Sequence, residues 1–420
     1  MKRFKIVQIV GKLILMLVSL MTAVGSYLFV RYPFAFQEIV TFAAMVNSPD
    51  ILKPDPNITT IEQFDRFVTD QLNSRDIRGG AVAIVADGKV AWSQGYGYAN
   101  WEDRKAATAD TPFMIGSISK AVTGVAVMHA VEAGQLNLDA DIQEYIDFEI
   151  NNPNVGTETP VTMRHLATHT SGISDRDWVY VNSYENGDPT KQLGEFLQDY
   201  LAEDGENYHP SRNFLDAQPG ETAEYSNIGA GVAGYAVGRA TGKRLDVYAR
   251  ENVFEPLKMH NTGWFLSDFE NQEDVAIPYA FMNRPHPHYG YPTWPEGQLR
   301  TSVNDLARLL AMVMNDGQLD GVQILQPETV DQMLAKQEFP GLLVESGEGI
   351  FWSYTNSGLI GHNGGDHGVV TAMYFNPETE VGVVILSNGG LDRGVGPVLT
   401  IARQILTSES TLSVIESIAR

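Results

Sequence analysis

The chain has 420 residues, and 43% of them are hydrophobic, which is enough for one large domain or two lobes that share a core. It contains no cysteine, which excludes a disulfide framework and thiolate zinc sites. The formal net charge is −23, so the surface would repel nucleic acid and anionic lipid headgroups. We therefore expect no nucleic-acid partner.

The first 30 residues combine a basic start with an uncharged apolar stretch. Residues 1–12 are predicted to be a basic cytoplasmic N-terminus. Residues 13–30 just span a hydrocarbon core of about 30 Å. A cleaved signal peptide is the alternative, since residues 23–25, Ala-Val-Gly, would suit a peptidase. We favour a retained single-pass anchor in the cell membrane, with the rest of the chain outside the cytoplasm, whether periplasmic or extracellular.

A linker and a capped helix are expected next. Residues 31–59 are predicted to be a linker, because the prolines between residues 49 and 56 exclude regular helix. Thr60 is expected to cap a helix, with Gln63 completing a capping box. The apolar face of this helix would consist of Ile61, Phe64, Phe67, Val68 and Leu72.

Two β-hairpins are predicted, one near each end of the remaining chain. In the first, residues 80–85 are expected to form a buried strand, and the tight turn Asp87-Gly88 connects it to a second strand at residues 89–93. The other hairpin pairs residues 369–375 with residues 381–387. A turn at residues 376–379 joins these strands, and a helix at residues 395–406 follows them.

This order of elements predicts an α+β fold: an antiparallel sheet flanked by helices, with an inserted all-helical lobe. The domain would span residues 60–410. Its sheet part comprises about 60–116 and 311–410, and its helical lobe about 117–310. The long polar excursion at residues 175–222 is expected to frame a cleft.

Ser117 and Lys120 form a Ser-x-x-Lys pattern at the start of a predicted helix. A serine hydroxyl is a poor nucleophile at neutral pH and needs a base within hydrogen-bond reach. Residues three apart lie on one helix face, so Lys120 is expected beside Ser117, where burial would depress its pKa. The apolar run at residues 121–131 suits a buried helix. The alternative is a serine that only caps the helix.

Two further patterns lie downstream. Residues 219–227, Pro-Gly-Glu-Thr-Ala-Glu-Tyr-Ser-Asn, place Tyr225 and Asn227 after a Pro-Gly turn and before a helical run. Residues 361–368, Gly-His-Asn-Gly-Gly-Asp-His-Gly, place His362 at the opening of a predicted strand. Other copies of the Tyr-x-Asn and His-x-Gly patterns lack these contexts.

In this order, the three patterns resemble the active-site motifs of the serine β-lactamase and penicillin-binding-protein superfamily. The likeness is to its class C β-lactamase-like branch, which includes esterases, D-amino-acid peptidases and D-alanyl-D-alanine carboxypeptidases. It covers roughly residues 60–408. It implies an oxyanion hole made by the backbone amides of Ser117 and Gly365, each donor being worth on the order of 10²-fold in rate. The implied substrate-binding residues are Asn227, His362, Gly364 and Gly365, with no metal and no cofactor.

The expected chemistry is acyl transfer in two steps. Ser117 attacks a carbonyl, and the N-terminus of its helix favours the developing negative charge. Lys120 is the expected base, and Tyr225 would pass a proton to the leaving group and help activate water for deacylation. Coupled groups titrate as a pair, so the sequence does not separate these two roles. Asn227 would hold the substrate amide or the Lys120 amine.

His362 departs from the family pattern, in which β-lactamases and transpeptidases usually carry a lysine that holds the substrate carboxylate. A histidine of ordinary pKa ~6.5 is mostly neutral at pH 8. This favours esters, amides or peptides over penicillins. If His362 does bind a carboxylate, turnover is expected to fall as pH rises through its pKa.

The other polar residues have simpler interpretations. His165 and His169 are expected to fix loop hydrogen bonds. The two histidines in the proline-rich loop at residues 284–292 lack a third ligand and are not expected to bind metal. Asp366 and His367 adjoin the third motif, and the sequence leaves open whether they line the cleft.

The function predicted from the sequence is a serine hydrolase that acts through an acyl-enzyme on a small ester, amide or D-amino-acid-containing peptide. One alternative is a D-alanyl-D-alanine carboxypeptidase or β-lactamase, and a second is a non-turnover penicillin-binding or sensory protein. The expected partners are the small-molecule or peptide substrate and, through the N-terminal helix, the membrane. The oligomeric state is left open.

Overall fold

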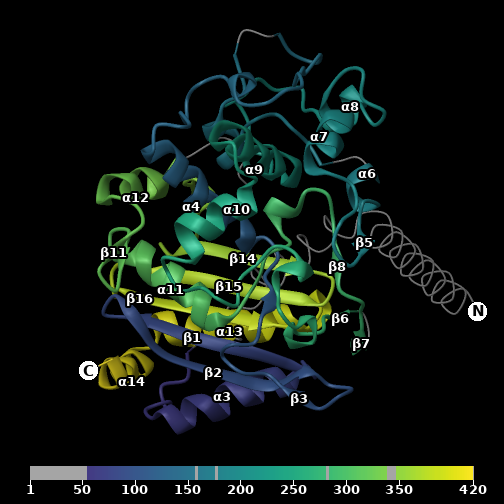
Figure 1. Cartoon of the computed structure of the whole chain (residues 1–420). Coiled ribbons are helices and arrows are strands. Elements are labelled where there is room, and N and C mark those ends of the chain that lie inside the picture. The colour runs from purple at the N-terminus through teal and green to yellow at the C-terminus, as the bar shows by residue number, and fades with distance from the viewer. Residues whose placement is uncertain (1–53, 157–158, 176–177, 281–282, 338–346, 420) are drawn as a thin grey trace, which may run out of the picture. The chain divides into compact units, whose positions relative to one another are not determined.

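The structure is a computed structural model that describes residues 54–156, 159–175, 178–280, 283–337 and 347–419 (Figure 1). The predicted anchor at residues 13–30 and most of the predicted linker lie outside these ranges. Within these ranges, none of the helices has the length and apolar character that a membrane crossing requires.

An antiparallel sheet of eight strands forms the centre of the described part of the chain. Strands β1 and β16 are neighbours, with Gly80 opposite Ser387, so the two ends of the domain meet in one sheet. The sheet order is β12 (Gly347–Glu348), β13 (Ser353–Tyr354), β14 (Ile360–Asp366), β15 (Val369–Asn376), β16 (Val381–Ser387), β1 (Gly79–Ala86), β2 (Lys89–Asn100) and β3 (Lys105–Ala106).

Both predicted hairpins are present. Asp87 and Gly88 have φ values of 51° and 66°, as a two-residue type I′ turn requires. Strand β2 continues to residue 100, well beyond the predicted end at residue 93. The prediction ended early because glycines are uncommon inside strands. Glycine is required at position 95, where a Cβ would come within 2.4 Å of the carbonyl oxygen of Ala107.

Alternating side chains of β1 face two different helical layers. Val82 and Ile84 pack with α3 (Ile61–Ser74), α13 (Leu391–Thr407) and α14 (Glu409–Ala419), which cover one face of the sheet in Figure 1. Ala83 and Val85 face α4 (Ile118–Glu132) and α11 (Val303–Met314). These two layers confirm an α+β fold with an antiparallel sheet.

The predicted cap of α3 is confirmed. The Gln63 amide donates to Thr60 Oγ1 at 3.3 Å, and the Thr60 amide donates to Gln63 Oε1 at 3.0 Å. The buried side chains Phe64, Val68 and Leu72 then fix this helix to the sheet.

The segment between the two sheet parts contains helices, long loops and short strands, which corrects the prediction of an all-helical lobe. Two-residue strands pair within it, and those between residues 279 and 290 lie in a stretch rich in proline and tyrosine that lacks a helical period. The helices are α5 (Met163–Ala167), α6 (Trp178–Val181), α7 (Leu193–Leu201), α8 (Pro210–Asn213), α9 (Asn227–Thr241), α10 (Leu245–Ala249) and α12 (Pro327–Leu334). The short strands pair as β4 (Phe113–Met114) with β9 (Arg300–Thr301), β5 (Glu185–Asn186) with β8 (Tyr289–Gly290), β6 (Tyr279–Ala280) with β7 (Arg284–Pro285), and β10 (Gln318–Leu319) with β11 (Val322–Gln323).

Three elements from distant parts of the sequence pack on one another beside the sheet. They are α4, α9 and the short 3₁₀ helix Trp294–Glu296. The end of β14 approaches the start of α4 from the sheet side. These contacts bring the three sequence motifs together.

Candidate active site

Ser117 lies immediately before the first residue of α4, and its side chain is partly exposed. It makes no side-chain cap to the helix. Instead, its Oγ lies 3.2 Å from the Nζ of Lys120. The structure therefore brings the predicted nucleophile and base together, and the capping alternative does not describe this serine.

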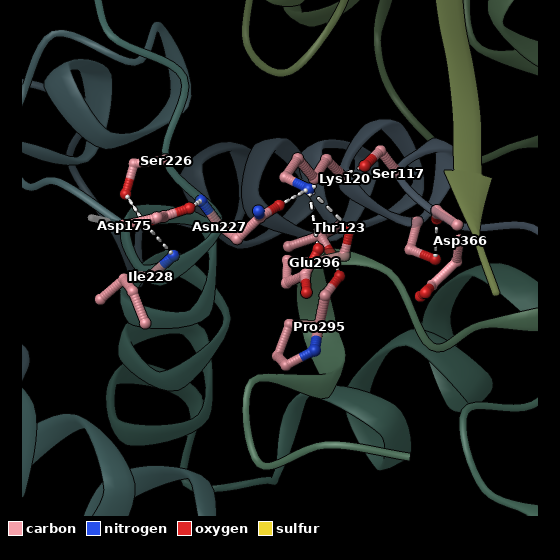
Figure 2. Close-up of polar contacts among 12 residues, drawn as sticks. Ser117, Lys120, Thr123, Asp175, Ser226, Asn227, Ile228, Pro295, Glu296 and Asp366 are labelled. Carbon is pink, nitrogen blue, oxygen red and sulfur yellow. Dashed lines mark hydrogen bonds and ion pairs between the residues drawn. The ribbon is translucent and has the colours of Figure 1, made fainter. Parts of the chain in front are cut away.

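Lys120 is completely buried and its Nζ is surrounded by four oxygens (Figure 2). Besides Ser117 Oγ, these are Asn227 Oδ1 at 2.6 Å and the backbone oxygen and Oε2 of Glu296, each at 2.9 Å. An ammonium has three protons, so the four oxygens compete, and the longest contact is the one to the serine. Burial lowers the pKa of Lys120, and the Glu296 carboxylate opposes that shift.

Tyr225 is the exposed member of the cluster, with 36% of its surface accessible. The Nζ of Lys120 lies 4.7 Å from its ring centroid, over the aromatic face. The ring also lies tilted against that of His169, with centroids 4.4 Å apart, and its centroid is 6.4 Å from that of the His362 ring. The expected neighbourhood of lysine and tyrosine is therefore present, while the proton-passing role of Tyr225 stays a prediction.

The start of α9 is fixed by Asp175, which the sequence analysis missed. Its carboxylate accepts from Ser226 Oγ at 2.9 Å, from the Asn227 amide at 2.5 Å and from the Ile228 amide at 3.1 Å (Figure 2). Burial raises the pKa of Asp175 to about 6, although these hydrogen bonds oppose the shift. The partners are some fifty residues away in sequence, so no local pattern indicates this cap.

Glu296 is the second residue that the sequence analysis missed. Only 2% of it is exposed, and its Oε1 accepts a hydrogen bond of 2.7 Å from the hydroxyl of Tyr180. The turn that carries it is tied to α4, because Thr123 Oγ1 donates to the backbone oxygen of Pro295 at 2.9 Å. The sequence Trp-Pro-Glu could have indicated this residue. A glutamate that directly follows two apolar residues is a candidate for burial, and a buried acid needs a partner.

The glycines of the third motif allow β14 to lie against the turn before Ser117. A Cβ on Gly364 would be 2.0 Å from the backbone oxygen of Ile115. Gly116 has φ +56°, and a Cβ on it would be 2.9 Å from the amide nitrogen of Gly365. The structure thus brings Gly364 and Gly365 beside the turn that leads into Ser117, while their role in an oxyanion hole stays a prediction.

His362 is buried and uncharged. Its Nδ1 lies 2.6 Å from the backbone oxygen of Asn363, an acceptor, so Nδ1 carries the proton and Nε2 carries a lone pair. Burial and the nearby Lys120 lower the pKa of His362 to about 4. At neutral pH His362 therefore has no positive charge with which to hold a substrate carboxylate, as the hypothesis from the sequence required.

His169 and Asp366 flank the same cluster. His169 Nδ1 accepts from the amide of Ser226 at 3.2 Å, so its hydrogen bond links the loop after α5 to the second motif. Asp366 is 4% exposed, its Oδ2 lies 3.3 Å from the hydroxyl of Tyr291, and burial raises its pKa to about 7. His165 caps α5 through the amide of Thr162, as a structural role predicts. Among the residues that the structure describes, no group of histidines and acids could hold a metal ion.

Comparisons with known proteins place the chain in a family. The model of the family described as Beta-lactamase matches residues 64–404. The chain is 25% identical over 338 residues to Protein flp of Staphylococcus aureus (strain N315), covering 78% of this chain and 63% of that protein's length. It is 26% identical over 348 residues to Penicillin-binding protein 4 of Amycolatopsis lactamdurans, covering 79% and 84% of the two chains.

Solved structures share the fold. The octameric penicillin-binding protein homologue from Pyrococcus abyssi superposes with a TM-score of 0.64 at 26% identity, covering 81% of this chain and 76% of that one. The β-lactamase/D-alanine carboxypeptidase from Pseudomonas syringae superposes with a TM-score of 0.62 at 20% identity, covering 80% and 98%. Because the family model spans most of the chain, the protein belongs to the β-lactamase family.

Proposed function

We propose that this protein is a serine hydrolase that forms an acyl-enzyme on Ser117. The observation that carries the proposal is the contact of 3.2 Å between Ser117 Oγ and the Nζ of Lys120, a lysine whose pKa is lowered by burial. A lysine that loses its proton more easily than usual is a competent base for a neighbouring hydroxyl.

The reaction would follow from the positions of these groups. Ser117 Oγ bonds to the substrate carbonyl carbon while its proton passes to Lys120 Nζ. The backbone amides of Ser117 and Gly365 would hold the developing oxyanion. The leaving group then departs with a proton from Lys120, directly or through Tyr225, and water later releases the acyl group.

The charges around the site support an uncharged ester, amide or D-amino-acid-containing peptide as substrate. His362 carries no positive charge at neutral pH because its pKa is about 4. The ionisable groups that raise the pKa of Lys120 are the carboxyl groups of Glu296, Asp175 and Asp366, and none of them can be positive. A substrate carboxylate would meet little positive charge here, which argues against the alternative of a D-alanyl-D-alanine carboxypeptidase or β-lactamase.

The proposed location outside the cytoplasm rests on the sequence alone. The apolar residues 13–30 support a catalytic part held outside the cytoplasm by a membrane anchor. A sensory protein that is acylated without turnover remains the alternative of a different class, and it would keep the same nucleophile.

The test compares wild type with Ser117→Ala, using a short-chain nitrophenyl ester, a chromogenic cephalosporin and a D-alanyl-D-alanine peptide, with intact mass followed in parallel. We expect ester turnover or an acyl adduct that disappears in Ser117→Ala. Ser119→Ala is the matched control, because the Ser119 hydroxyl is buried and donates to the Gly116 carbonyl. Activity retained in a folded Ser117→Ala would contradict the proposal, and an adduct without turnover would favour the sensory alternative.

A further inference from the structure

Glu296 contacts the base lysine twice. Its backbone oxygen and its Oε2 both lie 2.9 Å from Lys120 Nζ, and Lys120 and Glu296 are 0% and 2% exposed. Tyr180 holds the other carboxylate oxygen at 2.7 Å. The carboxylate is therefore fixed in place and shielded from water, next to the atom that would take the proton of Ser117.

A buried ammonium without a counter-charge is costly, so burial alone would leave Lys120 neutral over a wide pH range. The Glu296 carboxylate is the largest influence in the other direction, through its charge and its hydrogen bond. Asp175 and Asp366 act in the same direction but more weakly, and Figure 2 shows them at opposite ends of the labelled group, with Glu296 next to Lys120.

The remaining groups that face Lys120 carry no charge that could replace Glu296. Ser117 and Asn227 present neutral oxygens, and Tyr225 presents the face of its ring. The imidazoles of His169 and His362 lie close enough for Lys120 to lower their pKa values, and burial keeps both neutral.

We propose that Glu296 is a positioning residue that holds Lys120 as an ammonium beside Ser117, and so sets the pH above which the serine is activated. The inference rests on the proposed function, because it concerns the base of that reaction. Below this pH the ammonium has no lone pair for the serine proton. Above it, Lys120 gives one proton to solvent, accepts the proton of Ser117 as Oγ bonds to the carbonyl carbon, and passes that proton to the leaving group.

The test follows the labelling of Ser117 by an uncharged fluorophosphonate, measured by intact mass between pH 4 and 9. In this reaction the serine oxygen bonds to phosphorus, fluoride leaves and the serine proton passes to Lys120, so no later turnover is needed. Glu296→Gln keeps the shape and hydrogen-bonding capacity of the side chain but removes its charge. We expect the acid limb of the pH profile to move to lower pH by about one unit or more, a tenfold change in the ionisation of Lys120.

Two further variants separate charge from shape. Glu296→Asp keeps the charge but draws it back by one methylene, so its acid limb should lie between those of wild type and Glu296→Gln. Glu348→Gln is the matched control: Glu348 is 3% exposed and accepts from Ser353 Oγ at 3.1 Å, outside the active-site cluster. Its acid limb should coincide with that of wild type.

An acid limb that stays in place or moves to higher pH in Glu296→Gln would overturn the proposal for Glu296. Should Glu296→Gln not fold, NMR of protein labelled with ¹³C at lysine Cε gives the answer from Glu296→Asp. The Lys120 resonance, identified by its absence in Lys120→Arg, must titrate at lower pH than in wild type. Labelling that persists in Ser117→Ala would instead contradict the proposed function and leave the two failures distinct.

Discussion

At the scale of single residues, burial is what distinguishes this site. It lowers the pKa of Lys120, lowers that of His362 to about 4 and raises that of Asp366 to about 7. Each shift favours the uncharged form of its group. The lysine alone has a buried carboxylate in direct contact, and this is why it can carry a positive charge beside the nucleophile.

His362→Gln tests the charge of the third-motif residue. Since the pKa of His362 is about 4, this histidine is neutral throughout an assay between pH 5 and 8. We expect kcat/KM for the nitrophenyl ester to keep the same pH dependence between pH 5 and 8 in this variant, even if its magnitude falls. The disappearance of an ionisation near pH 6.5 would instead show that His362 acts as a cation.

Asp366→Asn tests the buried carboxyl group through stability. The pKa of Asp366 is about 7 in the folded protein and near 3.9 in the unfolded chain, so the folded protein binds the extra proton between these values. The contribution of Asp366 to stability is therefore fully present below pH 4, and it is lost as pH rises through the folded pKa of about 7. We compare the free energy of unfolding of Asp366→Asn with that of wild type. This difference should shift in favour of the variant by up to about 4 kcal/mol between pH 4 and pH 8.

Urea unfolding at several pH values measures this difference. The asparagine side chain can still accept from the His367 amide, which donates to Asp366 at 2.7 Å. A stability difference that does not change with pH would mean that Asp366 is ionised in the folded protein at pH 5.

At the scale of elements, α9 depends on a residue outside itself. Asp175 accepts three hydrogen bonds at the start of this helix, where Tyr225 and Asn227 are displayed. Loss of a helix cap costs about 1 kcal/mol, and each buried donor left without an acceptor adds about 1–3 kcal/mol. The cap thus couples the stability of the helix to the geometry of the second motif.

Asp175→Ala should lower the free energy of unfolding by about 2 kcal/mol or more and also lower kcat. Asp141→Ala is the matched control, because Asp141 caps the 3₁₀ turn at residues 142–144 through the Gln143 amide at 3.0 Å. That variant should lose stability without losing kcat. Denaturant unfolding and ester kinetics measure both quantities, and unchanged kcat in Asp175→Ala would separate the cap from the site.

Elements defined by local signals could be predicted from the sequence, and contacts between distant segments could not. The capping box at Thr60 and the turn at Asp87 are decided by neighbouring residues, and both are present. Ser117 precedes α4 directly and Lys120 lies in its first turn, so their contact also followed from the spacing of three residues. Glu296 meets Lys120 across 176 residues, and only the packing of α4 on the turn before Gly297 brings them together.

At the scale of the whole molecule, the charge is divided unevenly along the chain. Residues 1–31 contain five basic residues and no acid, so residues 32–420 carry a net charge of −28. Such an acidic body is repelled by anionic lipid headgroups. If the protein binds membranes, the binding must therefore come from the apolar residues 13–30 rather than from the surface of the catalytic part.

We therefore expect the full chain and a form without its first 53 residues to differ in membrane binding. The full chain should sediment with vesicles that contain anionic lipid and stay bound in alkaline carbonate, because about 18 apolar residues insert into the hydrocarbon core. A form that begins at residue 54 should stay in the supernatant at low salt and keep the ester turnover of the full chain. Sedimentation of this shorter form, or release of the full chain by carbonate, would place the membrane contact elsewhere. The salt dependence of binding distinguishes a charged surface contact from an inserted apolar segment, since screening weakens the former and leaves the latter in place.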